Sequence, residues 1–167
     1  MRSWLLIILA VALSGCAGYK LGPTNGMPAG SRTVKFQPFS NRTREPRVTE
    51  YMSTSLRKQL LQDGTFRLET SGSPDILVSG EITQFSRNGL SYDPNDVLTP
   101  QEYTLMMEAH ITAVDVVTGK TFINRTVRGS TYIRVGNDEF SSERQALPLL
   151  TDELARGAIS LLVDGEW

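Results

Sequence analysis

A single cysteine is the residue of this chain best suited to covalent chemistry. Cys16 follows the small residues Ser14 and Gly15, and an apolar run over 4–13 stands behind a short basic head. About ten apolar residues after such a head match a secretory signal, whereas a membrane-spanning helix needs about twenty. The small residues let an extended chain enter a peptidase site, and the thiol supplies a nucleophilic sulfur for a diacylglycerol. The pattern predicts a bacterial lipoprotein signal peptide over 1–15, with Cys16 as the lipidated N-terminus.

The residue after the cysteine indicates the membrane to which the protein is sorted, and the net charge excludes one class of partner. Ala17 lacks the acidic side chain that resembles an inner-membrane retention signal, which favours sorting to the outer membrane. Removing residues 1–15 takes away one basic residue, Arg2, so the formal net charge changes from −1 to −2. Bulk charge of this sign argues against nonspecific binding of nucleic acid. The chain has no second cysteine for a disulfide, so its hydrophobic core must suffice for stability.

The rest of the sequence offers little for catalysis. His110 is the only histidine, and no second His or Cys completes a transition-metal site. The sequence has no Gly-x-Ser-x-Gly elbow, phosphate-cradling Gly-Lys-Ser/Thr loop or dinucleotide-binding glycine motif. The acidic pairs at 138–139 and 152–153 resemble solvated surface positions more than an acid and base. We therefore expect no enzyme activity, no cofactor and no metal.

The composition shifts once along the mature chain. Residues 16–30 are rich in Gly and Pro and show no hydrophobic period, so we expect a lipidated tether there. The following segment, 31–167, is long enough to bury one hydrophobic core, and we expect a single domain.

Hydrophobic periodicity predicts the first two elements of that domain. Alternating apolar residues indicate a strand over roughly 32–37, which Pro38 ends. Apolar residues at spacing four then predict an amphipathic helix that starts near Pro46 and is closed by Gly64 in a left-handed cap. The loop between these elements carries a basic cluster that we interpret as solvated: Arg42, Arg44 and Arg47.

The middle of the chain has the pattern of strands. A strand is expected over 75–85, and the turn-forming residues of 86–100 predict a long surface loop. Two further strands with one buried face follow, over about 103–113 and 123–135. They form a long hairpin, because only a short turn that contains Gly119 separates them.

The turn fixes a testable register for this hairpin. If Gly119 takes the left-handed position of a three-residue loop, Val116 pairs with Lys120. Two pairs then lie directly opposite each other: Ala109 with Val127 on the buried side, and Glu108 with Arg128 on the outward side.

The second strand of the hairpin carries a basic charge bias. Residues 116–137 contain no acid but four basic side chains, and the alternation puts Arg128, Tyr132 and Arg134 on the outward face. One interpretation is an edge strand that positive charge protects from further pairing. The other is a surface for phosphate or carboxylate groups, for which the forked guanidinium is suited. The second interpretation makes these residues candidate contacts: Arg125, Arg128, Tyr132 and Arg134.

The last element and the fold class follow from the same patterns. An apolar stripe predicts a final helix that begins near Glu143 or Leu147 and ends near Val163, and Pro148 leaves its start open. The element order is β-α-β-β-β-α. It predicts an α+β two-layer sandwich in which two helices cover one face of a four-stranded mixed sheet.

The order of several short motifs resembles the LPS-assembly lipoprotein family (LptE). In chain order they are Gly18-Tyr19-Lys20-Leu21 closely after Cys16, Val34-Lys35-Phe36, Phe39-Ser40-Asn41, the first helix, the strand from Asp75 with Gly80, Gln101-Glu102-Tyr103, Asp115 and Thr118-Gly119-Lys120. The resemblance covers nearly the whole mature chain. It implies an outer-membrane lipoprotein that sits as a plug in a large β-barrel and helps it insert lipopolysaccharide into the outer leaflet, without catalysis. The sequence departs from the family at its end, Asp164-Gly165-Glu166-Trp167, which follows the last helix closely.

A second family leaves the function open. The segment 34–43, followed by a helix and a strand with Gly80, also resembles lipoprotein regulators of peptidoglycan synthases, which bind enzymes instead of lipid. The long hairpin and the short tether favour lipopolysaccharide assembly. A third class, an envelope hydrolase, lacks a nucleophile and base. The expected partners are therefore an outer-membrane β-barrel, the membrane through the lipid on Cys16, and lipopolysaccharide as a possible direct ligand.

Overall fold

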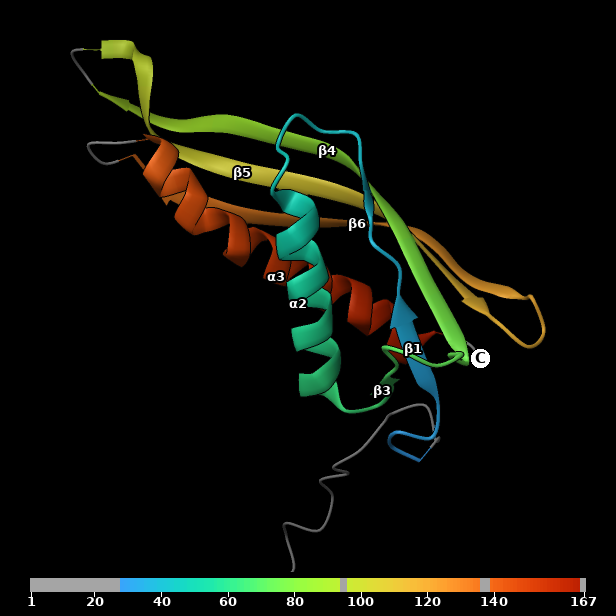
Figure 1. Ribbon diagram of the computed structural model, residues 1–167. Coiled ribbons are helices and arrows are strands. Elements are labelled where there is room, and N and C mark those ends of the chain that lie inside the picture. The colour runs from blue at the N-terminus through green and yellow to red at the C-terminus, as the bar shows by residue number, and fades with distance from the viewer. Residues whose placement is uncertain (1–27, 94–95, 136–138, 166–167) are drawn as a thin grey trace, which may run out of the picture.

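The computed structural model describes residues 28–93, 96–135 and 139–165. Its elements in chain order are β1 (Thr33–Phe36), β2 (Ser40–Asn41), α2 (Val48–Asp63), β3 (Arg67–Leu68), β4 (Ile76–Asp93), β5 (Asp96–Asp115), β6 (Thr121–Arg134) and α3 (Glu139–Asp164). The predicted α+β class is confirmed: two helices cover one face of a mixed sheet (Figure 1). The sheet has six strands instead of the predicted four, because β2 and β3 are short strands that the sequence pattern did not predict.

The sheet combines a small parallel part with a large antiparallel part. Its order is β3-β1-β4-β5-β6, with β2 paired to β4 beyond the end of β1. The strands β1 and β2 both run parallel to β4, so they act as one strand interrupted around Pro38. Long antiparallel ladders join β4 to β5 and β5 to β6, and these three strands form the twisted ribbon that runs across Figure 1.

The hydrophobic core lies between the sheet and the two helices. The helix α3 packs along β6 and β5, whereas α2 packs chiefly against α3. The predicted stripe of α2 is fully buried at Met52, Leu56 and Leu60. The helix ends as predicted at Gly64, which has a φ of 74° and donates its backbone N–H to the carbonyl oxygen of Leu60. The apolar stripe and the cap therefore do set the position of this helix.

Two glycines allow close packing on the helix-covered face. A Cβ on Gly80 would lie 2.4 Å from the buried ring of Phe39, which fills the space over β4. A Cβ on Gly129 would lie 3.0 Å from the carbonyl oxygen of Leu150 and 3.0 Å from the backbone nitrogen of Leu154. The absence of a side chain on β6 thus lets the α3 backbone approach the sheet directly.

The β5 and β6 hairpin has the predicted register but a different turn. Ala109 faces Val127, and Glu108 faces Arg128, as predicted. The predicted pairing of Val116 with Lys120 is wrong, because Asp115 donates its N–H to Lys120 and the loop therefore has one more residue. The Asp115 carboxylate accepts hydrogen bonds from the backbone of residues 117 and 118, which draws this residue into the turn. A bulge between Ala113 and Val114 restores the register.

The predicted loop over 86–100 is wrong. In this segment β4 continues to Asp93 and β5 already begins at Asp96. The ladder tolerates turn-forming residues here because its register shifts between Gly89 and Ser91 and again up to Asp93. The end of the β4–β5 pair extends beyond the helices (Figure 1). Because no helix covers this end, neither of its faces needs regular apolar alternation. Hydropathy therefore could not reveal the strands.

The final helix also differs from its predicted start. It begins at Glu139 and includes Pro148 in its interior. Leu147, Leu150 and Leu154 of the predicted stripe are all buried. Packing of this stripe against β5 and β6 outweighs the loss of one backbone hydrogen bond at the proline.

Candidate functional site

The predicted lipidation site lies outside the described residues. Cys16 belongs to the segment 1–27, so its modification stays a prediction from the sequence. The described part of the chain offers two surfaces that could bind a partner: the outer face of the sheet, which the helices do not cover, and an arginine-rich groove near the start of α2.

The outer face of the sheet is polar across β4, β5 and β6. Its outward positions carry hydroxyl and amide side chains at Ser86, Asn88, Thr104, Thr112, Asn124, Thr126 and Ser130. His110 also lies on this face, with its Nδ1 3.4 Å from the Thr126 hydroxyl oxygen. The face offers many hydrogen-bonding groups, with the exposed side chains of Met106 and Tyr132 among them.

Two of the predicted contact residues are paired on this face. Arg128 Nε lies 2.5 Å from Glu108 Oε1, and Arg134 Nη2 lies 2.8 Å from Glu102 Oε1. Both pairs are directly opposite each other on β5 and β6. The hydrogen bond that Arg128 donates to Glu108 and the negative charge of that carboxylate raise the pKa of Arg128. The positive charge of β6 is therefore balanced by acidic residues of β5, which are distant along the chain but adjacent in the sheet.

The other two predicted contact residues lie apart from each other. Tyr132 is 74% exposed on the same outward side as Arg128 and Arg134, as predicted. Arg125 has the opposite parity and lines a pocket between the start of β6 and the end of α3, beside Asp164. The structure thus brings Arg128, Tyr132 and Arg134 together but not Arg125. The strand β6 is also an edge of the sheet, as one of the two interpretations of its positive charge requires.

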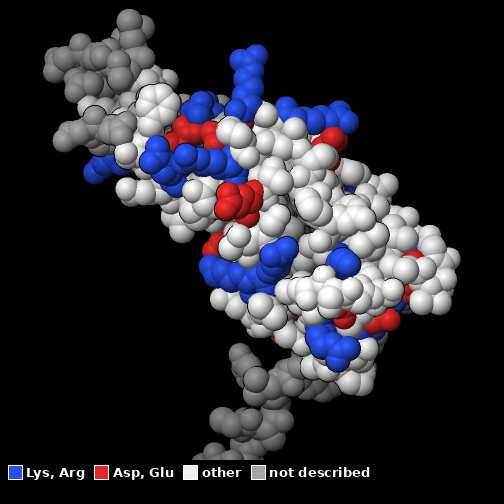
Figure 2. All heavy atoms as spheres, in the orientation of Figure 1, with Lys and Arg blue, Asp and Glu red and all other residues white. Residues whose placement is uncertain are grey.

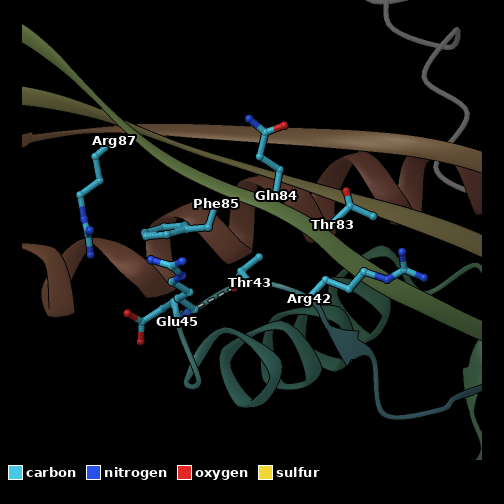
Figure 3. A pocket seen from close by; sticks show the side chains of 8 residues that line it. Arg42, Thr43, Glu45, Thr83, Gln84, Phe85 and Arg87 are labelled. Atoms are coloured by element: carbon cyan, nitrogen blue, oxygen red, sulfur yellow. Dashed lines mark hydrogen bonds between the residues drawn. The ribbon is translucent and has the colours of Figure 1, made fainter.

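A groove lined by five arginines forms where β4 passes the start of both helices. We call this surface the arginine groove; it consists of two adjoining pockets, of about 380 and 190 Å³, that share Glu45 and Arg87. Its arginines come from three regions of the chain: Arg42, Arg44 and Arg47 before α2, Arg87 on β4, and Arg144 on α3. Figure 3 shows Phe85 between Arg87 and the Thr43 to Glu45 segment.

The groove contains both paired and unpaired cations. Arg87 donates two hydrogen bonds to the buried carboxylate of Glu143, at 2.6 and 2.5 Å, and lies over the ring of Phe85. Arg42 lies on the far side of the pocket (Figure 3). It pairs with Glu81 of β4. Among the residues that the structure describes, Arg44, Arg47 and Arg144 form no ion pair.

Sequence reasoning found only part of this groove. The sequence showed the basic cluster before α2. Arg87, however, lies in the segment that was predicted as a loop, and Arg144 lies next to a helix start that the sequence left open. No linear pattern links them, because the groove exists only once β4 is extended and α3 begins at Glu139.

Three aspartates with lowered pKa values belong to structural contacts. The backbone N–H and the hydroxyl of Thr33 lower the pKa of Asp75. The backbone N–H of Thr118 does the same for Asp115, which also pairs with Arg32. Burial alone would raise the pKa of Asp152, but hydrogen bonds from Lys58 and Ser55 outweigh it and the pKa is lowered. These carboxylates hold elements together rather than form an acid and base pair.

The described residues contain no group of three or more His, Cys, Asp or Glu side chains placed to hold a metal ion. None of the helices in the same residues is both long and apolar enough to cross a membrane.

Comparison with known protein families decides the relationship of the chain. The model of the LptE family, described as lipopolysaccharide-assembly, matches residues 31–163. The chain belongs to the LptE family. The match covers every described helix and strand except the last residue of α3, so the whole fold is that of the family. The chain is thus a lipopolysaccharide-assembly lipoprotein, as the motif order indicated. No curated protein matches the chain.

Solved structures share this fold at low sequence identity. Protein XCC0632 from Xanthomonas campestris is 9% identical, with a TM-score of 0.62 and coverage of 87% of this chain and 91% of that one. The hypothetical protein CT253 from Chlamydia trachomatis is 12% identical, with a TM-score of 0.58 and coverage of 80% and 96%. A minor lipoprotein from Acinetobacter baumannii is 13% identical, with a TM-score of 0.52 and coverage of 80% and 93%. These similarities concern the fold alone.

Proposed function

We propose that this LptE-family protein is an outer-membrane lipoprotein, anchored at Cys16 on the periplasmic side, that acts as a non-catalytic plug and assembly partner of the β-barrel that inserts lipopolysaccharide. The family membership supports the role in lipopolysaccharide assembly. The barrel and the plug position are inferred from the motif resemblance and from the outer face of the sheet, and the anchor is inferred from the signal-peptide pattern that precedes Cys16.

The polar outer face is the observation that carries the plug proposal. The lumen of a large outer-membrane barrel is polar, so a protein that fills it needs a broad surface of hydrogen-bonding groups instead of an apolar patch. The outer face provides hydroxyls and amides on three long strands, and its ion pairs leave little net charge. We propose that Arg128, Tyr132 and Arg134 are the part of this face that contacts the barrel or the phosphates of lipopolysaccharide.

Copurification from detergent extracts tests the partner. We expect a large outer-membrane β-barrel to copurify with the chain, and a photoreactive residue in place of Thr126 to crosslink to it from the β6 edge of the outer face. Recovery of a peptidoglycan synthase instead of a barrel would support the alternative function. A barrel that copurifies but crosslinks only from the helices would retain the partner and reject the outer face as the contact.

A Cys16→Ala variant tests the anchor. Because the chain has no other cysteine to acylate, this variant is expected in the soluble periplasmic fraction or as a precursor with an uncleaved signal. The measurement is fractionation in cells that lack the barrel partner, so that binding to the barrel cannot retain the variant. If the variant still fractionated with outer membranes there, the lipid would not be the main determinant of its location.

A further inference from the structure

The arginine groove has no role in the proposed plug surface, because it lies on the helix-covered side of the sheet. We propose that it binds an extended acidic segment of a partner protein, whose carboxylates pair with Arg44, Arg47 and Arg144. This inference goes beyond the proposed function and does not depend on the identity of a barrel.

The charge of the groove is the first argument. Five arginines and two glutamates line its two pockets, and both Arg42 and Arg87 already have a carboxylate partner within the protein. The three remaining guanidinium groups are exposed and have no ion pair among the described residues. Blue side chains gather on the upper half of the surface in Figure 2, where α2 and α3 begin. Guanidinium groups that line the same groove favour a ligand with several negative charges.

The loop that carries two of these arginines is fixed in place. The Asn41 side chain donates to the carbonyl oxygen of Glu45 at 2.8 Å and accepts a hydrogen bond from the backbone of Thr43 at 2.8 Å. The N–H of Arg42 donates to the Ile82 carbonyl oxygen on β4. The loop backbone is therefore held between β4 and α2, and binding does not have to order it, which reduces the entropic cost of binding.

The shape and lining of the groove favour a peptide over a phosphorylated glycolipid. Two shallow pockets adjoin at Glu45 and Arg87, and the aromatic side chains of Phe85 and Phe140 line them together with the arginines. Phe140 is 79% exposed and offers an apolar contact beside Arg144. Glu45 in the lining forms no ion pair among the described residues, and its charge repels a doubly charged phosphate more than a single carboxylate. An extended segment that carries both acidic and apolar residues matches this lining.

Fluorescence anisotropy with the purified full chain in detergent tests the proposal. The probe is a fluorescein-labelled peptide of alternating Glu and Leu. Reversing the three unpaired charges, as Arg44→Glu, Arg47→Glu and Arg144→Glu together, is expected to weaken peptide binding by about tenfold or more. The matched control reverses three exposed cations outside the groove, as Arg57→Glu, Arg67→Glu and Lys120→Glu, and should change binding by only about twofold.

Three outcomes would overturn the proposal. Equal loss of binding in both triple variants would show that only net charge matters, and no binding by the unmodified chain would show that the groove takes no acidic peptide. Displacement of the peptide by inorganic phosphate or lipopolysaccharide at matched ionic strength would assign the groove to phosphate instead. Thermal midpoints of both variants should stay close to that of the unmodified chain, since exposed charges contribute little to stability. None of these results depends on whether a barrel copurifies.

Discussion

The two faces of the β4–β6 sheet are made by the same strands but differ in burial: one packs against the helices and the other is exposed to solvent. On the helix-covered face, Leu105, Met107 and Ile111 of β5 are buried, and α3 packs on this strand. On the outer face of the same strand, Glu102 and Glu108 pair with arginines of β6 and remain in contact with solvent. The inner face therefore carries the stability of the fold, whereas the outer face is free to carry recognition. Substitutions on the two faces should have very different effects.

The largest difference in stability is expected between a buried side chain of α3 and an exposed side chain on the outer face of β6. Leu154 is fully buried, and Leu154→Ala should lower the free energy of unfolding by about 2–5 kcal/mol because it leaves a cavity under the sheet. Ser130→Ala on the outer face should change it by less than about 0.5 kcal/mol. Urea denaturation measures both values. Similar losses for the two variants would mean that the outer face is also covered.

Replacing either of two glycines by alanine gives a second comparison, in which the expected changes in stability have opposite signs. Gly129→Ala puts a Cβ within 3.0 Å of the α3 backbone, so we expect a loss of about 1–3 kcal/mol as the helix is pushed from β6. Gly157→Ala lies within α3 with no atom in the way, and should stabilise the protein by up to about 1 kcal/mol. Thermal unfolding of both variants tests this, and stabilisation by Gly129→Ala would show that α3 does not approach the sheet this closely.

The polar contact between the helices should make stability depend on pH. The hydroxyl of Ser55 donates to Asp152 at 2.6 Å, and Lys58 pairs with the same carboxylate. Because the pKa of Asp152 is lowered in the folded protein, its contribution is complete above the unfolded value of 3.8 and is lost as the pH falls below it. In the Asp152→Asn variant, the loss of stability that protonation of Asp152 causes at low pH should disappear. An unchanged slope below pH 3.8 in that variant would remove the role assigned to Asp152.

The smallest effect is expected for the ion pairs of the outer face. Arg128→Glu places two acids opposite each other and should cost about 0.2–1 kcal/mol, and adding Glu108→Arg should restore the stability because the pair is only reversed. Binding of lipopolysaccharide separates the two interpretations of Arg128. If its positive charge contacts phosphate, the reversed pair should not restore binding, because the cation has moved to β5. Full restoration would leave the pair with a structural role only.

Local patterns in the sequence determined a large part of this protein. The spacing of apolar residues placed α2, and the need for a positive φ placed its cap at Gly64. Strict alternation on both strands set the inward and outward sides of the hairpin, because a shift by one residue would have buried Arg128 and exposed Val127. The motif order identified the family, since each motif keeps its place along the chain.

Only the tertiary structure decided how distant charges combine. The extended β4 and β5 could not be read from 86–100, because strands outside the helix layer need no apolar alternation and their bulges tolerate turn-forming residues. Sheet pairing set Glu102 against Arg134, which neutralised a basic bias that was evident on β6 alone. The packing of α3 on the sheet brought Arg144 beside Arg87 and Arg47 and made the groove. These are contacts between residues far apart in the chain, and no local periodicity records them.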